Sequence, residues 1–402
     1  MFKQTFVCPY CFEERKLSEL QFRCTNKRCA DVDDVELTKY ENGDITNPMK
    51  GKICFPVQLK GGSVPREGIC PTCGEKSHKI VCPACHNPLP EATITGKDMI
   101  FSIIGARGSG KTNFVSVLIQ NLSERIVGSF NDGSIEGFDD TMSRFRKGEA
   151  YNYLYIKNEV PPKTVSSLVS TENGAFKPLI YTIKFQTKGF LKKEIESFTF
   201  AFFDTAGEDL EDADTMNTVN KYIYMSSGIL FLLDPMQIPA VVNQLDDDTV
   251  SRSSAASGDS DSSAIMTRVS NMIRDYRHLK SDKTIDIPVA AVFSKLDAFS
   301  SLIPEGSTVL DPSPHCDEGK FDLTDAHNVD SEIRSLLTTW GESNFIKQVD
   351  INYSNTAFFA CSALGMNNNP KANGKIERPR PHRIEDPILW LLMQNNVIKA
   401  GK

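Results

Sequence analysis

Apolar and polar positions change their pattern at about residue 98 of this 402-residue chain. After that point, apolar runs of strand length recur at 99–105, 179–185, 197–204, 228–234, 287–294 and 356–362. Helix-like segments separate several of these runs, at 111–126, about 213–226, 262–280 and 326–348. Buried strands that alternate with helices predict an α/β fold built on a mainly parallel sheet.

One pair of runs departs from this alternation. Residues 179–188 and 192–204 are separated by little more than the KGFL turn, so we expect an antiparallel hairpin and hence a mixed sheet. Near the end of the chain, the apolar segment 384–398 has a favourable helix start and is expected to dock on the sheet. We expect two mobile parts: the acidic, Ser-rich segment 246–264, which has too few apolar residues to become ordered, and the polar loop 366–382.

Composition changes this picture mainly through charge. The net charge is −7, and residues 1–97 carry 14 Lys and Arg against 12 Asp and Glu. Neither balance is typical of a nucleic-acid binder, so we favour protein partners over nucleic acid. The N-terminus lacks a secretory pattern, and no apolar stretch approaches the roughly 18–20 residues of a membrane span. We therefore expect a cytoplasmic protein with reduced thiols.

The sequence GARGSGKT at 105–112 fits the phosphate-binding pattern G-x-x-x-x-G-K-[ST]. It lies between an apolar strand and an apolar-periodic helix, which is the context that this loop requires. The residues expected to bind the nucleotide phosphates or Mg²⁺ are Gly105, Arg107, Gly108, Ser109, Gly110, Lys111 and Thr112. Lys111 is expected to reach the β- and γ-phosphate oxygens, and the Thr112 hydroxyl to ligate Mg²⁺.

A second motif favours guanine as the base. The segment Ser294-Lys295-Leu296-Asp297 closes a buried strand and has the form [NTS]-K-x-D. The Asp297 carboxylate can accept hydrogen bonds from guanine N1–H and the N2 amino group, a pair that adenine lacks. The Lys295 stem can lie along the base, and Ser294 stands where Asn is usual. The alternative is a solvated loop that touches no nucleotide.

Two further strand ends complete a set of four ordered motifs. The strand at 356–362 ends in Ser362-Ala363-Leu364, which resembles the S-A-K/L signature whose backbone contacts guanine O6. The strand at 197–204 ends in the D-T-A-G sequence that starts at Asp204. With these motifs, residues 98–400 resemble the Ras-like P-loop GTPases of the translation-factor-related (TRAFAC) class. Relative to a minimal member, this chain carries insertions at about 127–178, 236–286 and 300–350.

The resemblance implies roles for the residues of the remaining motif. Asp204 would hold Mg²⁺ through water, and the Gly207 N–H would bond the γ-phosphate. Glu208 stands where many relatives place the Gln that orients the attacking water, so we expect slow intrinsic hydrolysis. Thr164 is the candidate for the switch threonine that ligates Mg²⁺, with Thr171 and Thr182 as runners-up.

Arg107 occupies the third position of the phosphate loop. We expect it to be a solvated residue that pairs with a carboxylate, and a cis arginine finger is the alternative.

Nine of the eleven cysteines precede residue 86, and eight of them form two sets of four. The predicted zinc ligands are Cys8, Cys11, Cys24, Cys29, Cys70, Cys73, Cys82 and Cys85. Adjacent sets would give two zinc ribbons, whereas interleaved sets would give a cross-braced unit. Cys54 is a spare, and His78 and His86 are possible substitute ligands. We expect a zinc-binding module with two four-cysteine sites at 1–92, followed by the GTPase domain at 98–400.

Together these patterns predict a GTP-hydrolysing molecular switch that uses GTP, GDP, Mg²⁺ and two Zn²⁺, and whose state a protein partner reads. In architecture the chain is also similar to bacterial GTPases with cysteine-rich N-termini that are associated with conflict or phage-defence operons. Two alternatives stay open. One is an ATP-using P-loop enzyme in which Asp297 touches no base. The other is a nucleotide-binding scaffold that barely hydrolyses.

Overall fold

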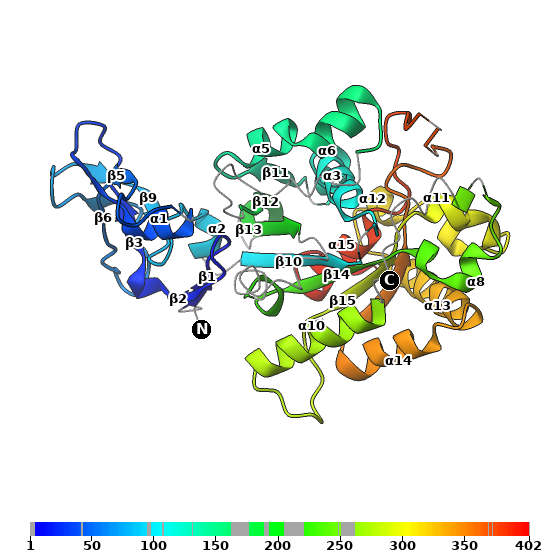
Figure 1. Ribbon diagram of the computed structural model, residues 1–402. Coiled ribbons are helices and arrows are strands. Elements are labelled where there is room, and N and C mark those ends of the chain that lie inside the picture. The colour runs from blue at the N-terminus through cyan, green and yellow to red at the C-terminus, as the bar shows by residue number, and fades with distance from the viewer. Residues whose placement is uncertain are drawn as a thin grey trace.

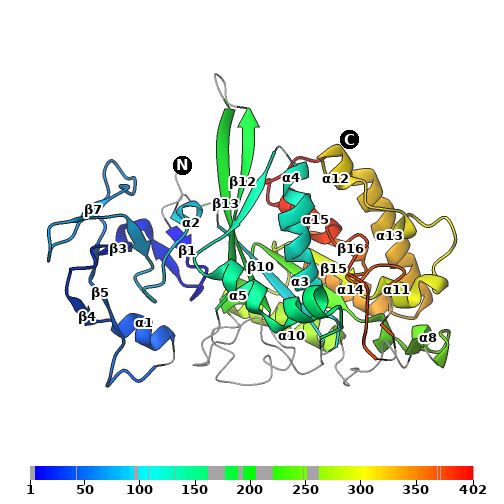
Figure 2. The same ribbon diagram turned by 90° about the horizontal axis from the view of Figure 1, so that it is seen from above.

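The computed structural model describes residues 5–41, 43–94, 98–106, 108–130, 132–161, 177–188, 193–204, 221–247, 249–250, 262–368, 370–371 and 373–401. We refer to residues 5–94 as the cysteine-rich unit and to residues 98–401 as the sheet unit. The cysteine-rich unit, blue in Figure 1, lies beside the start of strand β10 (Asp98–Gly105). The second view in Figure 2 shows the same placement.

A seven-stranded mixed sheet organises the second unit, in the order β11-β12-β13-β10-β14-β15-β16. Its strands besides β10 are β11 (Ser134–Gly137), β12 (Leu179–Lys188), β13 (Lys193–Asp204), β14 (Gly228–Leu233), β15 (Val289–Phe293) and β16 (Thr356–Ala360). The strands β13, β10, β14, β15 and β16 run parallel, whereas β12 is antiparallel to β13 and to β11. The predicted mixed sheet and the predicted hairpin are both confirmed, and Figure 2 shows that hairpin extending past the other strands.

Helices cover both faces of this sheet. The longer ones are α3 (Lys111–Asn121), α10 (Ser262–Tyr276), α13 (Leu323–Thr339), α14 (Ser343–Asn352) and α15 (Asp386–Gln394). The shorter ones are α4 (Val127–Ser129), α5 (Thr141–Lys147), α6 (Glu149–Tyr151), α8 (Pro239–Val242), α11 (Leu296–Phe299) and α12 (His315–Glu318). The two-sided cover explains why the central strands are apolar along their whole length rather than at alternate positions.

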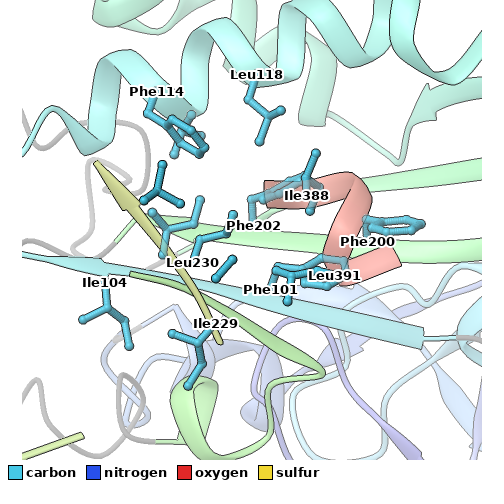
Figure 3. Close-up of a cluster of buried hydrophobic side chains, with 14 of the residues drawn as sticks. Phe101, Ile104, Phe114, Leu118, Phe200, Phe202, Ile229, Leu230, Ile388 and Leu391 are labelled. Carbon is cyan, nitrogen blue, oxygen red and sulfur yellow. The ribbon is translucent and has the colours of Figure 1, made fainter. Parts of the chain in front are cut away.

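The core lies where α3 and α15 meet one face of the sheet. Figure 3 shows Phe101, Phe202 and Leu230 facing Leu118 of α3 and Leu391 of α15. Neighbouring residues of the strands point to the opposite face. There the ring of Phe231 lies 5.8 Å from that of Phe345 on α14. Since β10 is buried on both faces, the loop that follows it starts from a rigid support.

Three expectations require comment. The predicted helix at 326–348 is wrong as a single element, because Gly341 (φ +87) separates α13 from α14. Most of 213–226 and 246–264 lies outside the described residues. The described residues of 366–382 contain no named helix or strand, as expected for a loop.

Small strand pairs build the cysteine-rich unit. Its strands are β1 (Thr5–Val7), β2 (Glu14–Lys16), β3 (Gln21–Arg23), β4 (Asp31–Asp33), β5 (Lys50–Lys52), β6 (Cys54–Pro56), β7 (Gly68–Ile69), β8 (Lys76–Ser77) and β9 (Lys79–Val81). They form the pairs β1-β2, β4-β5 and β7-β8 and the three-stranded sheet β6-β3-β9. The helices α1 (Val35–Tyr40) and α2 (Glu91–Ile94) complete the unit. The strands are short, and buried side chains such as Phe6, Phe22 and Phe55 pack between them.

Candidate nucleotide site and metal centres

The phosphate loop joins β10 to α3 in a conformation that requires its glycines. Gly108 and Gly110 both have φ near +79, in the left-handed region that other residues rarely adopt. Gly105 is needed for a different reason, because a Cβ there would lie 2.5 Å from the Leu232 carbonyl oxygen. The loop therefore starts in close contact with β14 and turns sharply into the N-terminus of α3.

Lys111 and Ser109 turn polar groups into this loop. The Lys111 ammonium donates hydrogen bonds to the carbonyl oxygens of Gly105 (2.7 Å) and Ala106 (3.0 Å), and only 8% of the residue is exposed. The buried Ser109 hydroxyl has no hydrogen-bond partner among the described residues. Buried polar groups are normally satisfied, so an unpartnered hydroxyl at this position fits a loop shaped for a ligand that supplies oxygen acceptors.

On the other side of β14, the Ser294–Asp297 segment follows β15. Lys295 has φ +58, and its ammonium lies 2.7 Å from the Asp234 carboxylate at the end of β14. Ser294 donates from its hydroxyl to the Leu233 carbonyl oxygen (3.1 Å). Asp234 was not among the predicted site residues, because in the sequence it reads only as the end of an apolar run. In the fold it fixes the lysine of the base motif.

Asp297 faces the segment that follows β16. The Leu296 N–H donates to the Cys361 carbonyl oxygen (3.0 Å), which ties the two segments together. Burial raises the pKa of the Asp297 carboxyl, and a hydrogen bond from the Ser362 side chain partly opposes that rise. Ser362 itself is fully buried, and its hydroxyl also accepts from the Gly365 N–H (2.8 Å). Ala363 and Leu364 complete the turn beside it.

Strand register brings these segments to one edge. Gly105 pairs with Leu232, Leu233 with Phe293, and Phe293 with Ala360. The phosphate loop, Asp234, the Ser294–Asp297 segment and the Ser362–Leu364 segment each begin within two residues of these partners. They therefore line the carboxyl edge of adjacent parallel strands, where ligands of open α/β sheets bind.

Several predicted residues cannot be placed in this way. Arg107, Thr164, Thr171, Gly207 and Glu208 lie outside the described residues. Asp204 is the last residue of β13, next to β10, and only its backbone is described.

Thr182 does not fit its role as a runner-up for the switch threonine. It pairs with Thr199, which pairs with Asp98 at the opposite end of β10 from Gly105. Asp98 and Gly105 are seven strand residues apart, so Thr182 lies about 23 Å from the phosphate loop along the strand direction.

The eight predicted zinc ligands gather in two groups of four. One group holds Cys8, Cys11, Cys82 and Cys85, and the other holds Cys24, Cys29, Cys70 and Cys73. The contacts between sulfurs are 3.7 Å for Cys8–Cys85, 3.8 Å for Cys11–Cys82, 3.7 Å for Cys24–Cys73 and 4.0 Å for Cys29–Cys70. Four ligands about 2.3 Å from a tetrahedral Zn²⁺ lie roughly 3.8 Å apart, so both groups fit zinc.

The pairing is nested, which neither of the two predicted arrangements describes. The first cysteine pair in the sequence meets the last, and the second meets the third. Backbone N–H groups of Tyr10 and Ala84 donate to the sulfurs of Cys8 and Cys82 (3.4 Å each), as in zinc knuckles. Burial raises the pKa of the Cys8 thiol well above its usual range. Four thiols this close together need a cation before all of them can ionise, because neighbouring thiolates repel one another.

Cys54 belongs to neither group, and it faces a polar cluster that the sequence did not reveal. His86 Nδ1 lies 2.6 Å from the Asp34 carboxylate, which also pairs with Arg23 (2.7 Å) and caps α1 at the Leu37 N–H (3.0 Å). Asp34 thus anchors three groups, and its carboxylate, the Cys54 sulfur and a His86 ring nitrogen lie within 4.8 Å of one another. His78 is exposed, and neither histidine is part of either four-cysteine group.

Comparisons with known proteins include a curated bacterial relative. The chain is 25% identical over 337 residues to a protein of Mycolicibacterium smegmatis provisionally named ESX-1 scaffolding and assembly protein SaeC. The match covers 77% of this chain and 78% of the relative. No protein-family model matches the chain. Separately, none of the helices in the described ranges combines the length and apolar character needed to cross a membrane.

Solved structures with partial likeness include the GTPase-like domain of Saccharomyces cerevisiae Ski7 bound to GTP. Its TM-score is 0.33 at 16% identity, over 75% of this chain and 51% of the other. The same domain with GDP and phosphate gives 0.30 at 14% identity, over 75% and 49%. Methanosarcina barkeri Roco2 RocCORdC bound to GDP gives 0.22 at 12%, over 66% and 44%. The chain thus spans about half the length of these solved chains.

Proposed function

We propose that this chain binds GTP along the carboxyl edge of the sheet and hydrolyses it to GDP and phosphate. The observation that carries this proposal is the position of Asp297. It lies beside Ser362, one strand beyond the β14 strand that supports the phosphate loop. A carboxylate there can accept two hydrogen bonds from guanine, whereas adenine offers no such pair of donors. Lys295, fixed by Asp234, supports the same end of the site.

At the phosphate end, the chain provides positive charge and N–H groups. The Lys111 ammonium would exchange its loop carbonyl partners for β- and γ-phosphate oxygens. The buried Ser109 hydroxyl and the N-terminus of α3 would add to this cradle. Arg107 belongs to the same loop, as a solvated residue or, alternatively, as a group that stabilises the charge of the transition state.

Thr112 and Asp204 supply the kind of oxygen ligand that Mg²⁺ prefers, and Thr164 is proposed as the third protein ligand. Bound there, Mg²⁺ would neutralise charge on the phosphates. Gly207 would sense the γ-phosphate through its N–H. The segments around 160–170 and 204–220 would then change with the nucleotide.

Glu208 makes slow hydrolysis part of the proposal. A carboxylate can orient a water molecule, but its charge opposes the phosphate that the water must attack. We therefore infer that a protein partner or a second group of this chain completes the reaction. A rapid single turnover by the isolated chain would contradict this inference.

The cysteine-rich unit is proposed to hold two zinc ions and to be the surface that partners contact. In this reading, residues 1–92 form the zinc module and 98–400 the GTPase domain with its three insertions. A regulatory role in bacteria, such as phage defence, is the process that the architecture suggests. The setting that we propose is the cytoplasm.

A nucleotide-dependent scaffold is the second candidate. The name of the curated relative refers to scaffolding and assembly, and Glu208 is compatible with weak hydrolysis. A scaffold of this kind would bind GTP as proposed and release little phosphate with or without a partner. An ATP-using enzyme is the third candidate, in which Asp297 would not contact the base.

Thermal protection by each nucleotide tests the proposal. GTP with Mg²⁺ is expected to raise the midpoint of heat unfolding, and ATP at the same concentration is expected to raise it far less. Equal protection by ATP would favour the ATP-using alternative. A phosphate-release assay on the same sample then separates the GTPase from the scaffold.

A further inference from the structure

Two ion pairs join the cysteine-rich unit to the sheet unit, and both lie close in sequence to the proposed switch segments. Lys177 pairs with Glu41 at 2.6 Å, and Lys221 pairs with Glu13. In the sequence, Lys177 follows the proposed switch segment that contains Thr164. Lys221 follows the proposed switch segment that begins with D-T-A-G. The cysteine-rich unit therefore contacts the chain just after each of the two segments that should respond to the γ-phosphate.

The contact at Lys177 is held from both sides. Arg144 donates hydrogen bonds to the carbonyl oxygens of Lys177 (2.9 Å) and Pro178 (2.8 Å), which fixes the backbone that enters β12. The partner, Glu41, is a buried residue at the C-terminal end of α1. A buried Glu41 carboxylate without its lysine would be strongly unfavourable. A displacement of Lys177 should therefore also move Glu41 and the end of α1.

The contact at Lys221 includes an aromatic pair as well as the ion pair. The fully buried Phe12 lies 5.3 Å, between ring centroids, from the fully buried Tyr222. The Tyr222 hydroxyl donates to the Phe101 carbonyl oxygen in β10, the strand that carries the phosphate loop. A displacement of residues 221–222 would therefore also displace Phe12.

The first cysteine group makes this contact rigid. Phe12 directly follows Cys11, and its left-handed backbone (φ +55) is closed by a hydrogen bond from its N–H to the Cys8 carbonyl oxygen (3.0 Å). The Cys8 N–H in turn donates to the Glu13 carbonyl oxygen (3.0 Å). The cysteines of this group thus set the positions of both residues that contact the side chains of Lys221 and Tyr222.

We propose that the cysteine-rich unit is the built-in reader of the nucleotide state, coupled to the two switch segments through Glu41–Lys177 and Glu13–Lys221. This inference rests on the proposed function. It adds that the nucleotide changes the cysteine-rich unit itself. By thermodynamic reciprocity, whatever binds and fixes that unit must also change the relative affinities for GTP and GDP.

Hydrogen–deuterium exchange on the full-length, zinc-loaded chain tests the inference. The protein is compared when saturated with GDP and with a non-hydrolysable GTP analogue. Peptides that cover 8–16 and 35–41 are expected to differ in exchange rate by about fivefold or more between the two states, the low end of typical coupling. Peptides that cover 60–69 include β7, which lies on the side of the unit away from the sheet (Figure 2), and are expected to exchange alike.

Variants isolate the two ion pairs. In E13Q/E41Q the difference is expected to disappear while both nucleotides still bind, and K177Q/K221Q should act alike from the other side. The matched control is E67Q, which breaks the Glu67–Lys76 pair (2.6 Å) within the cysteine-rich unit and should keep the difference. Zinc content shows that each variant has folded.

Two results would overturn the inference and leave the proposed function standing. One is equal exchange at 8–16 and 35–41 although both nucleotides bind, and the other is a difference that survives in E13Q/E41Q. A failure of either guanine nucleotide to bind would instead remove the proposed function, and this inference with it.

Discussion

At the residue scale, the requirements of Asp297 for binding and for stability conflict. Its carboxylate must stay ionised to accept two hydrogen bonds from a guanine ring, yet its half-buried position disfavours charge. Burial raises the pKa of Asp297, so the folded chain holds this proton more tightly than the unfolded chain does. The stability that the group contributes is therefore present at low pH and is lost as the pH rises through the folded pKa.

Replacing this charge should separate stability from binding. We expect Asp297→Asn to raise the denaturation midpoint of the nucleotide-free chain at neutral pH, because the ionised carboxylate is no longer buried there. GTP affinity should fall by about 100-fold, since hydrogen bonds to a charged group contribute about 1.5–3 kcal/mol each. Denaturant titrations and GTP binding, measured on one preparation, check both effects. Unchanged GTP affinity would show that Asp297 does not touch the base.

His86 provides a second test at this scale. It occupies the position after its cysteine pair that Gly74 occupies in the sister pair, and both have left-handed backbones (φ +53 and +72). A side chain there costs about 1–2 kcal/mol, which the bond to Asp34 helps to offset. Both His86→Gly and His86→Ala lose the contact with Asp34. Only the Ala variant still places a side chain on a left-handed backbone, so only it keeps that energetic cost. We therefore expect the Gly variant to be more stable by about 1 kcal/mol in denaturant titrations, and equal midpoints would contradict this.

At the element scale, the nested cysteine groups predict a definite pattern of zinc loss. Removing two ligands of one group, as in C8S/C85S, should release about one of the two zinc ions, because the other group stays complete. C8S/C24S damages both groups and should release both ions. Adjacent pairing would give the reverse, and zinc quantification on the purified variants distinguishes the two.

A buried charge cluster joins several elements of the sheet unit. The Arg383 guanidinium donates hydrogen bonds to both carboxylate oxygens of Asp325 in α13 (2.9 Å each) and to the Asp386 carboxylate in α15 (2.7 Å). It also donates to the carbonyl oxygens of Thr308 and Asp311 (2.8 Å each). The side chain is fully buried. The cluster thus fixes the C-terminal helix against α13.

We expect Arg383→Met to cost about 3–5 kcal/mol of unfolding free energy, because it leaves two carboxylates buried without their cation. Arg334→Met is the matched control. It also breaks a pair of ionic contacts, to Asp330 (2.9 Å) and Asp350 (2.8 Å), but at a partly exposed site, so it should cost far less. Similar losses in the two variants would count against a structural role for the buried cluster.

Sequence patterns located the buried parallel strands because these are apolar throughout, and they located the β12–β13 hairpin because only a short turn separates its two apolar runs. They missed β11, whose residues SIEG are short and polar, as an edge strand allows. The cysteine spacing identified the eight candidate ligands but not which of them belong to the same group of four, since that depends on which strands lie side by side. Asp234 and Asp34 were missed for the same reason: each takes its role from residues far away in the sequence.

At the scale of the whole molecule, one unit is built around two four-cysteine groups and the other around a packed sheet. The cysteine-rich unit is made of strands of two or three residues, whereas the sheet unit buries a continuous core between two layers of helices. The ion pairs between the two units involve Lys177 and Lys221, which follow the proposed switch segments in the sequence. If the proposed coupling holds, a partner that binds the cysteine-rich unit would respond to the nucleotide state.

The most direct test of the central claim is extraction and identification of the nucleotide that co-purifies with the chain, with zinc quantified in the same sample. The account predicts a guanine nucleotide and about two zinc ions per chain. Asp297→Asn should lose the nucleotide and keep both ions. An adenine nucleotide in the extract, or a guanine nucleotide retained fully by the variant, would contradict it.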